Sequence, residues 1–205
     1  MNESEKNNSI DNGYWIDENF HYDKDYSQSH YYDPQEILHN WYTRELNDAY
    51  NFAYQNGITT MSSIHLANME WSLTRIAMAK MLSQYAINIL RMAPDFSNIC
   101  YFNDISDELD RQYNNWVLLA CHLWIMWQNM PNNKFRPYDL VTRAEFATAL
   151  SRLLFHMEDG EIKYYEPHIY MLKTFWIISD TNPDLQERRW YVMLMLLRYH
   201  QHNSR

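Results

Sequence analysis

The sequence predicts an all-α fold built from repeated helical segments. The chain has 205 residues, 46% of them apolar, which is enough for one domain of ordinary size or a short array of repeats. From about residue 42 onward, segments with helical periodicity alternate with turn-rich loops. Three segments of this part share one layout, and their unequal spacing indicates repeats with variable loops.

The first 41 residues differ from the rest in composition. They are rich in Asn, Asp, Ser, Tyr and His and have little periodicity. Residues 1–36 hold nine acidic residues and two lysines, so most of the net charge of −9 lies there. Such a stretch cannot bury enough apolar surface to fold alone, and we expect residues 1–41 to be a disordered acidic leader.

Each repeat is expected to contain a first helix, a connector and a second helix. The first helix ends in a Gly-Ile or Trp-Ile pair, and the second helix opens at an arginine. These arginines are Arg75, Arg143 and Arg189, which are 68 and 46 residues apart. We divide the repeats at residues 42–99, 100–160 and 161–205, the third being degenerate.

The second helices carry their own start signals. Thr74 and Thr142 precede two of the arginines and are expected to be N-caps, because a threonine hydroxyl can accept a backbone N–H of the first turn. Apolar residues then follow at helical spacing and predict a core-facing stripe. They are Met78, Met81, Leu82 and Tyr85 in the first repeat, and Phe146, Ala149, Leu150, Leu153 and Leu154 in the second. Pro94 and Pro137 fall in the connectors.

Several classes of protein are excluded or disfavoured by the composition. No apolar run reaches the length of a membrane span, and the first residues lack the pattern of a signal peptide. The absence of a Lys/Arg cluster argues against nucleic-acid binding. Cys100 and Cys121 form no CxxC pair or disulfide framework, and we expect buried free thiols rather than a bridge.

No catalytic or metal-binding constellation is evident. The nine histidines form no HExxH motif and no Cys/His quartet, so we expect no metal and no cofactor. The sequence has no GxSxG elbow and no phosphate-binding glycine loop. An unrecognised enzyme would require His156, Glu158 and another titratable group to converge in a pocket. We therefore expect a protein that is not an enzyme.

The second repeat resembles the S-layer homology (SLH) repeat. Phe102, Asp104 and Ile105 match its start. Its characteristic end is matched by Phe135, Arg136, Pro137, Val141, Thr142, Arg143, Ala144, Glu145 and Phe146. The first repeat keeps Leu73-Thr74-Arg75 but has Ile76-Ala77 where the family has Ala-Glu, and the third keeps Arg189 but has Tyr191 at the Glu position. The resemblance covers residues 45–198.

This resemblance implies a fold and a function. SLH modules carry three repeats packed as a pseudo-threefold prism, and grooves between the repeats bind a secondary cell-wall polysaccharide, often through a pyruvylated, anionic sugar. Carried over by position, the expected ligand-binding residues are Arg143, Arg75 and Arg189, with Thr142 and Glu145 in support. An arginine at a helix N-terminus offers a planar fork and a partial positive charge to a carboxylate. A cell-surface location follows from the resemblance alone.

Two other interpretations stay open. An arginine in the first helical turn can pair with an acid across the repeat interface instead of binding a ligand, and such an exposed pair adds little stability. The same fold could also serve as a helical protein–protein interaction module of the cell surface that binds no glycan.

The tryptophans stand where the repeat pattern favours glycine. The chain has 3 Gly and 8 Trp, whereas about 14 Gly are usual at this length. Trp124 and Trp176 occupy the place that Gly57 has in the first repeat, just after a helix, where glycine closes the last turn in a left-handed conformation. The family also favours glycine at Trp71, Trp116, Trp127 and Trp190. We hypothesise that these codons are UGA read as glycine in the source organism, and expect Trp124 and Trp176 to have left-handed backbone or to point outward.

Overall fold

The computed structural model confirms the all-α class. It describes residues 43–126 and 133–203, which belong to the unit Leu38–Arg205. In chain order the helices are α2 (Arg44–Gln55), α3 (Arg75–Asn88), α4 (Asp107–Gln112), α5 (Trp116–His122), α6 (Arg143–Phe155), α7 (Glu166–Thr174) and α8 (Arg189–Asn203). These residues form isolated β-bridges but no strand. The predicted leader, residues 1–41, lies outside the described residues.

The three long second helices begin where the repeat layout predicted, at Arg75, Arg143 and Arg189. Thr74 and Thr142 are the N-caps of α3 and α6, and each hydroxyl accepts a hydrogen bond from the backbone N–H three residues further on. Both predicted caps are confirmed. α6 has a complete capping box, because the Glu145 carboxylate also accepts the Thr142 N–H.

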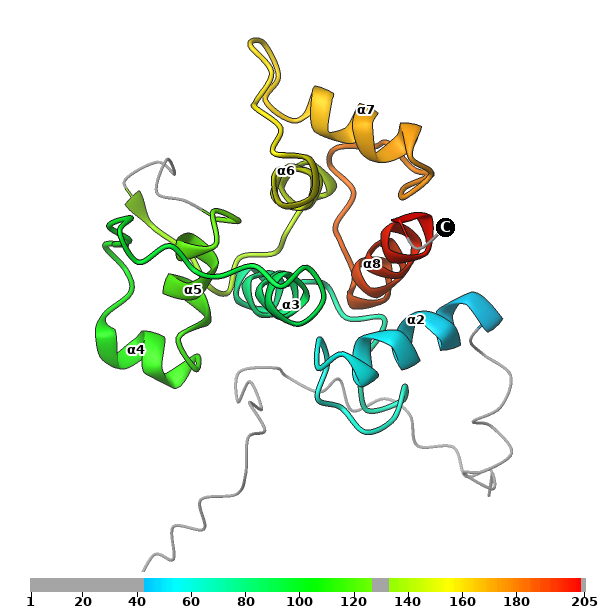
Figure 1. Ribbon diagram of the computed structural model, residues 1–205, viewed down its shortest axis with the longest axis horizontal. Helices are drawn as coiled ribbons and strands as arrows, with labels where there is room; N and C mark the ends of the chain where they lie inside the picture. Colours follow the sequence, from blue (N-terminus) through cyan, green and yellow to red (C-terminus); the bar gives the residue numbers. More distant parts are fainter. Residues whose placement is uncertain (1–42, 127–132, 204–205) are drawn as a thin grey trace, which may run out of the picture. The chain divides into compact units, whose positions relative to one another are not determined.

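The helices pack in three pairs, each of which joins two different repeats. α2 packs on α8, α5 on α3, and α7 on α6 (Figure 1). These pairs join the first repeat to the third, the second to the first, and the third to the second. Each first helix therefore covers the second helix of another repeat, and every repeat contacts both of the others.

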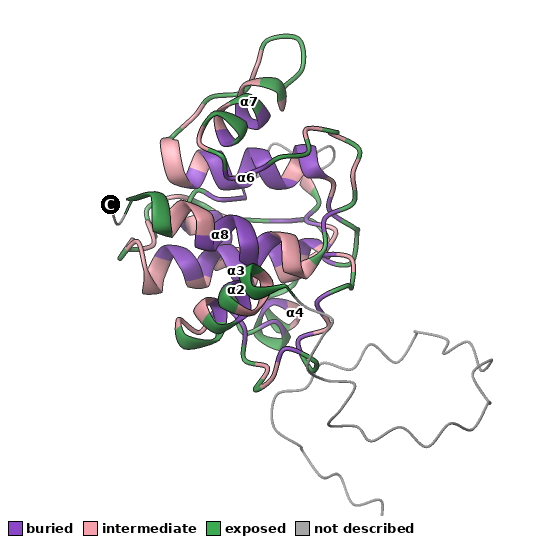
Figure 2. Ribbon diagram, turned by 90° about the vertical axis from the view of Figure 1, so that its right-hand side faces the viewer, coloured by how far each residue is buried: buried purple, intermediate pink, exposed green. Residues whose placement is uncertain are grey.

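Among the helices, α3, α6 and α8 carry the largest numbers of buried residues (Figure 2). The predicted stripes are confirmed, since all of their members are buried except Leu154, which is half-buried. Burial of one such side chain contributes roughly 1.5–3 kcal/mol to stability. These three helices thus supply the largest helical share of the core, and α2, α5 and α7 pack on them.

The backbones that enter α3, α6 and α8 are joined in a closed cycle of hydrogen bonds. The Leu73 N–H donates to the Glu187 carbonyl (2.7 Å), the Glu187 N–H to the Val141 carbonyl (2.9 Å), and the Val141 N–H to the Leu73 carbonyl (2.9 Å). Each of these residues stands two positions before an opening arginine. Every member of the cycle is buried, so each of its polar backbone groups depends on the other two segments.

Two further sets of bonds run around the cycle in the opposite direction, from the first repeat to the second, the second to the third and the third to the first. The N–H of each opening arginine donates to a carbonyl of another repeat at 2.7–3.1 Å, and so does the N–H of the residue after it, at 2.9–3.1 Å. The first set pairs Arg75 with Asp139, Arg143 with Leu185 and Arg189 with Trp71. The second set pairs Ile76 with Pro137, Ala144 with Pro183 and Trp190 with Met69. The helix N-termini therefore find their backbone partners in a neighbouring repeat.

Cys100 and Cys121 form a disulfide, so the predicted free thiols are wrong. Their Cα atoms lie 6.0 Å apart, a distance that a disulfide spans. The connector after α3 runs beside the end of α5, where the Asp95 N–H donates to the His122 carbonyl (2.8 Å). This long-range contact brings the two cysteines together, and nothing in their spacing of 21 residues announces it.

Trp124 and Trp176 have the backbone conformation expected of glycine. Their φ angles are 59° and 58°, close to the 69° of Gly57. All three residues are followed by a buried isoleucine whose N–H reaches back to the helix, as in a Schellman motif. Trp176 is 84% exposed and Trp124 is 44% exposed, so both parts of the expectation are confirmed. Trp71, Trp116 and Trp190 have ordinary φ angles, and Trp127 lies outside the described residues.

Replacing Trp176 by glycine should stabilise the protein. We expect Trp176→Gly to raise the free energy of unfolding by about 1 kcal/mol, because left-handed backbone costs a residue with a Cβ roughly 1–2 kcal/mol. The matched control is Trp190→Gly in the first turn of α8, which should lower stability by about 1 kcal/mol or more. Urea unfolding followed by circular dichroism measures both. Equal losses of unfolding free energy in the two variants would contradict a left-handed, glycine-like backbone at position 176.

Candidate functional site

The opening arginines lie at equivalent junctions between repeats. Each guanidinium donates to a backbone carbonyl of the following repeat, in the segment that precedes the opening arginine there; the first repeat follows the third in this order. The donor–acceptor pairs are Arg75 to Phe135 (2.6 Å), Arg143 to Asp180 (2.9 Å) and Arg189 to Ala67 (3.5 Å). The structure thus places the three predicted arginines at three separate junctions rather than in one site. Thr142 and Glu145 lie with Arg143 in the first turn of α6.

Arg143 is held in a buried ion pair. Its Nε and Nη2 donate to the two carboxylate oxygens of Glu187, with 3.2 Å between Nη2 and Oε2. The two side chains are 2% and 0% exposed. The Arg143 guanidinium also lies 5.1 Å from the centre of the Tyr191 ring. Arg143 therefore already has a carboxylate partner within the chain, and it offers almost no surface to a ligand.

Burial changes the titration of this pair. Loss of solvation raises the pKa of Glu187 to about 7, and the positive charge of Arg143 opposes part of that rise. Because the folded state then binds a proton more tightly than the unfolded chain does, the contribution of Glu187 to stability is greatest in acid and falls as the pH rises toward 7. Glu187 is thus a costly residue to bury at neutral pH unless Arg143 stays beside it.

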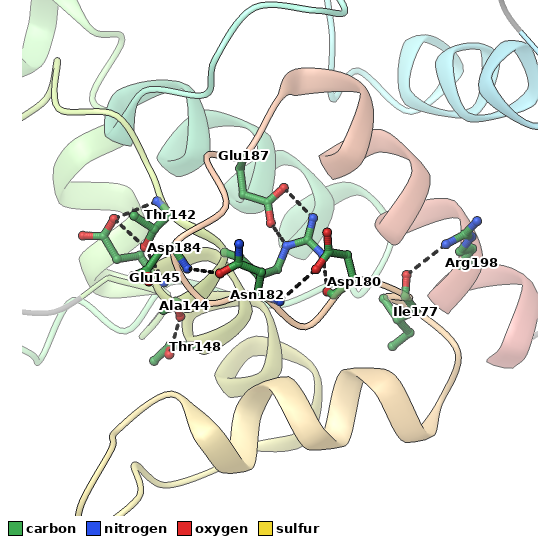
Figure 3. Close-up of polar contacts among 11 residues, drawn as sticks. Thr142, Ala144, Glu145, Thr148, Ile177, Asp180, Asn182, Asp184, Glu187 and Arg198 are labelled. Atoms are coloured by element: carbon green, nitrogen blue, oxygen red, sulfur yellow. Dashed lines mark hydrogen bonds and ion pairs between the residues drawn. The ribbon is translucent and has the colours of Figure 1, made fainter.

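Arg75 also has an internal carboxylate. Its Nη1 lies 3.4 Å from Oε1 of Glu145, and the two side chains are 6% and 24% exposed. The other oxygen of Glu145 accepts the Thr142 N–H at 3.0 Å, in the capping box drawn in Figure 3. Thr142 and Glu145 therefore fix the start of α6, and Glu145 joins α6 to the first repeat through Arg75.

Arg189 differs from the other two arginines. It is half-buried, and its guanidinium lies 5.6 Å from the centre of the Trp71 ring. Burial lowers its pKa, and no carboxylate of the described residues opposes that shift or forms an ion pair with Arg189. Arg75 and Arg143 each form an ion pair with a carboxylate of the chain, whereas Arg189 forms none with any residue that the structure describes.

A groove of about 350 Å³ lies beside the Arg143 junction. Its walls come from the start of α2, from α8 and from the segment after α7, and they include Trp190 and Tyr191. Arg198 closes one side with a two-pronged ion pair to Glu45 (2.8 and 3.1 Å), and it also donates to the Ile177 carbonyl (Figure 3). The groove has the size of a small-ligand pocket, but its two arginines are already paired with carboxylates.

One hydrogen-bonded row was not expected from the sequence. Ser151 Oγ lies 2.6 Å from His168 Nδ1, and His168 Nε2 lies 3.1 Å from an oxygen of Asp159, which also accepts from Arg152. Ser151 and His168 are 0% exposed, and burial lowers the pKa of the histidine. A hydroxyl so enclosed cannot reach a substrate, so the row joins α6 to α7 and is not a catalytic triad.

The residues named for a possible enzyme do not meet in this row or in the groove. His156 is the C-cap of α6, with left-handed backbone. Glu158 lies in the loop that follows, and neither residue lines the groove. Among the described residues no group of three or more His, Cys, Asp or Glu could hold a metal ion. In the same ranges no helix is both long and apolar enough to cross a membrane.

Sequence reasoning missed Glu187 and Ser151, although both carry a recognisable signal. Glu187 stands where the other repeats have Leu73 and Val141, so it is a charged residue at an apolar position. Ser151 stands within the buried stripe of α6. A polar residue at a core position predicts a buried partner, because an unpaired one would be costly.

Comparisons with known proteins leave the chain without an assigned family. No protein-family model matches it, and a search of curated proteins finds no significant relative.

The buried ion pair of Arg143 and Glu187 can be tested by mutation. Arg143→Met should lower the free energy of unfolding at pH 8 by about 3 kcal/mol, because it leaves the Glu187 carboxylate buried without a counter-ion. The matched control is the double variant Arg143→Met with Glu187→Leu, which removes both charges and should recover most of that loss. Urea unfolding measures both. A loss below about 1 kcal/mol for Arg143→Met would contradict the buried pair.

Proposed function

We propose that residues 42–205 form a three-repeat SLH-like module that anchors a surface protein noncovalently to an anionic cell-wall polysaccharide. In this proposal the repeats are related by a pseudo-threefold axis through the hydrogen-bond cycle of Leu73, Val141 and Glu187. The module has a binding role and no catalytic one. Its partner is a wall glycan that carries carboxylate groups, such as those of pyruvylated sugars.

One observation carries this proposal. The cycle brings an arginine of each repeat to its junction with another repeat, at an equivalent place each time. These junctions correspond to the grooves that the SLH resemblance implies. A guanidinium recognises a carboxylate through paired N–H donors, and its charge is permanent. Arg75 and Arg143 already have internal carboxylate partners, so the proposal rests first on Arg189, which forms no ion pair with a described residue.

The disulfide supports a location outside the cytoplasm. Structural disulfides form and persist in oxidising surroundings and are rare in the cytosol of most organisms. The bridge between Cys100 and Cys121 joins the connector after α3 to α5. It therefore agrees with a module on the cell surface, where a wall-binding protein must work.

A surface beside this disulfide favours a second candidate function. Phe96 and Ile99 are 74% and 84% exposed, and the Phe96 ring lies 4.9 Å from that of His122. They place two large, exposed apolar side chains on the connector after α3, which is typical of a contact surface for another protein. A module that assembles with other surface proteins and binds no glycan would use this face.

Retention on cell walls tests the proposal. We expect the purified chain to cosediment with sacculi of the source organism and to lose about tenfold in retention when the salt concentration rises from about 0.05 M to about 0.5 M, since screening weakens pairing between charges. Extraction of the wall polysaccharide with hydrofluoric acid should abolish retention. Equal retention by extracted and untreated sacculi would contradict glycan anchoring. Retention by a surface-protein fraction alone would favour the second candidate.

A further inference from the structure

Helix α7 is held to the rest of the protein by few contacts. It buries three side chains, those of His168, Ile169 and Leu172, and its main packing partner among the described helices is α6 (Figure 1). The segment before it, residues 156–165, is largely exposed, and Ile162 within it is 94% exposed. A helix that buries so little apolar surface is expected to open locally at a lower free energy than the core helices.

One of the three buried side chains of α7 is a histidine with a polar partner at each ring nitrogen. Ser151 Oγ of α6 lies 2.6 Å from Nδ1 of His168, and an oxygen of Asp159 lies 3.1 Å from Nε2. His168 is 0% exposed and is the only buried histidine among the described residues. The contact between α7 and α6 therefore includes a group of the kind that takes up a proton between pH 5 and pH 8.

The neutral imidazole satisfies both of its contacts at once. Nε2–H donates to the Asp159 carboxylate, which leaves Nδ1 to accept from the Ser151 hydroxyl. A second proton would make Nδ1 a donor, and Ser151 would then have to turn its own proton to the Thr148 carbonyl, at the longer distance of 3.4 Å. Because the ring is shielded from solvent, the added charge would also lack hydration. The folded structure thus fits the neutral ring better than the charged one.

The charged groups that act on the ring do not offset this loss of hydration. Asp159 favours the protonated ring, but its carboxylate also accepts from Arg152 of α6, whose positive charge acts in the opposite direction. Burial is the largest effect, and it lowers the pKa of His168 from its ordinary value of 6.5. A detached histidine therefore binds a proton more tightly than the buried one. The stability that these contacts contribute is full above about pH 6.5 and falls as the pH drops toward the lower pKa of the folded state.

We propose that the hydrogen-bonded row from Ser151 through His168 to Asp159 is an acid-sensitive latch, whose protonation in weak acid releases α7 and the loop before it from α6. The backbone cycle between the repeats includes no residue of α7, so the rest of the module stays folded when the latch opens. The inference goes beyond the proposed function and does not depend on glycan binding.

Release of α7 would uncover the contact between the second and the third repeat. α6 belongs to the second repeat and α7 to the third, and α6 carries the largest buried face of the two. The ring of Phe155, at the end of α6, stacks on that of Phe175, just after α7, with 5.1 Å between the ring centres. Opening of the latch in acid therefore exposes apolar surface that is covered at neutral pH.

Native-state hydrogen exchange at two pH values measures the release in the full chain. After correction for the pH dependence of intrinsic exchange, the opening constant reported by the amides of Ile169 and Leu172 should rise about tenfold from about pH 7.5 to about pH 5.5, because the open form takes up the proton. Glu187 titrates in the opposite sense and is not part of α7. Local opening of α7 therefore reports on His168 more directly than global unfolding does.

Two variants separate the latch from an ordinary loss of packing. His168→Gln keeps a donor and an acceptor but does not titrate, so its opening constants at the two pH values should agree within about twofold, whatever their size. The matched control is His156→Asn, at the exposed C-cap of α6, where asparagine suits the left-handed backbone. This control removes a nearby histidine outside the row and should keep the rise of about tenfold.

Three results would overturn the latch. If NMR titration of the folded chain gives His168 a pKa at or above its ordinary value of 6.5, the row favours the charged ring and acid tightens the contact. If the α7 amides have the same opening constant as the α6 amides at both pH values, α7 does not open separately. If the rise in acid persists in His168→Gln, another group causes it.

Discussion

The closed cycle of backbone hydrogen bonds among Leu73, Val141 and Glu187 is the constraint on which the rest of the structure depends. Three segments far apart in sequence each satisfy the N–H of one neighbour and the carbonyl of the other, so a segment has both of its bonds only when all three are in place. The cycle lies immediately before the three opening arginines. It therefore determines where α3, α6 and α8 begin and which repeat each arginine faces.

Charge at the three junctions varies on this constant backbone. At the junctions of Arg75 and Arg143, the arginine is paired with a carboxylate of the chain itself, Glu145 or Glu187. At the third junction, that of Arg189, the arginine forms no ion pair with a carboxylate of the described residues. A buried ion pair adds little net stability, but the fold is strongly destabilised when one of the two charges loses its partner. The two ion-paired junctions therefore favour a single arrangement of the repeats.

Much of the fold could be predicted from the sequence because its signals are local. The threonine caps, the helical stripes and the glycine-like ends of α2, α5 and α7 each depend on a few neighbouring residues, and all of them were found. The disulfide, the Arg143–Glu187 pair and the row from Ser151 to Asp159 depend on contacts between distant segments, and all of these were missed. The arginines were expected from a motif. Their differing partners follow from residues outside that motif.

Native-state hydrogen exchange tests the cycle most directly. If the three segments form one closed unit, the amide protons of Leu73, Val141 and Glu187 should exchange only through global unfolding and give the same free energy of opening. Exchange can be followed by NMR in the free protein without any ligand. Equal, maximal protection of the three amides is the result that the account predicts. If one of these amides exchanges orders of magnitude faster than the other two, the cycle is not closed. The claim that one cycle positions all three arginine junctions would then be wrong.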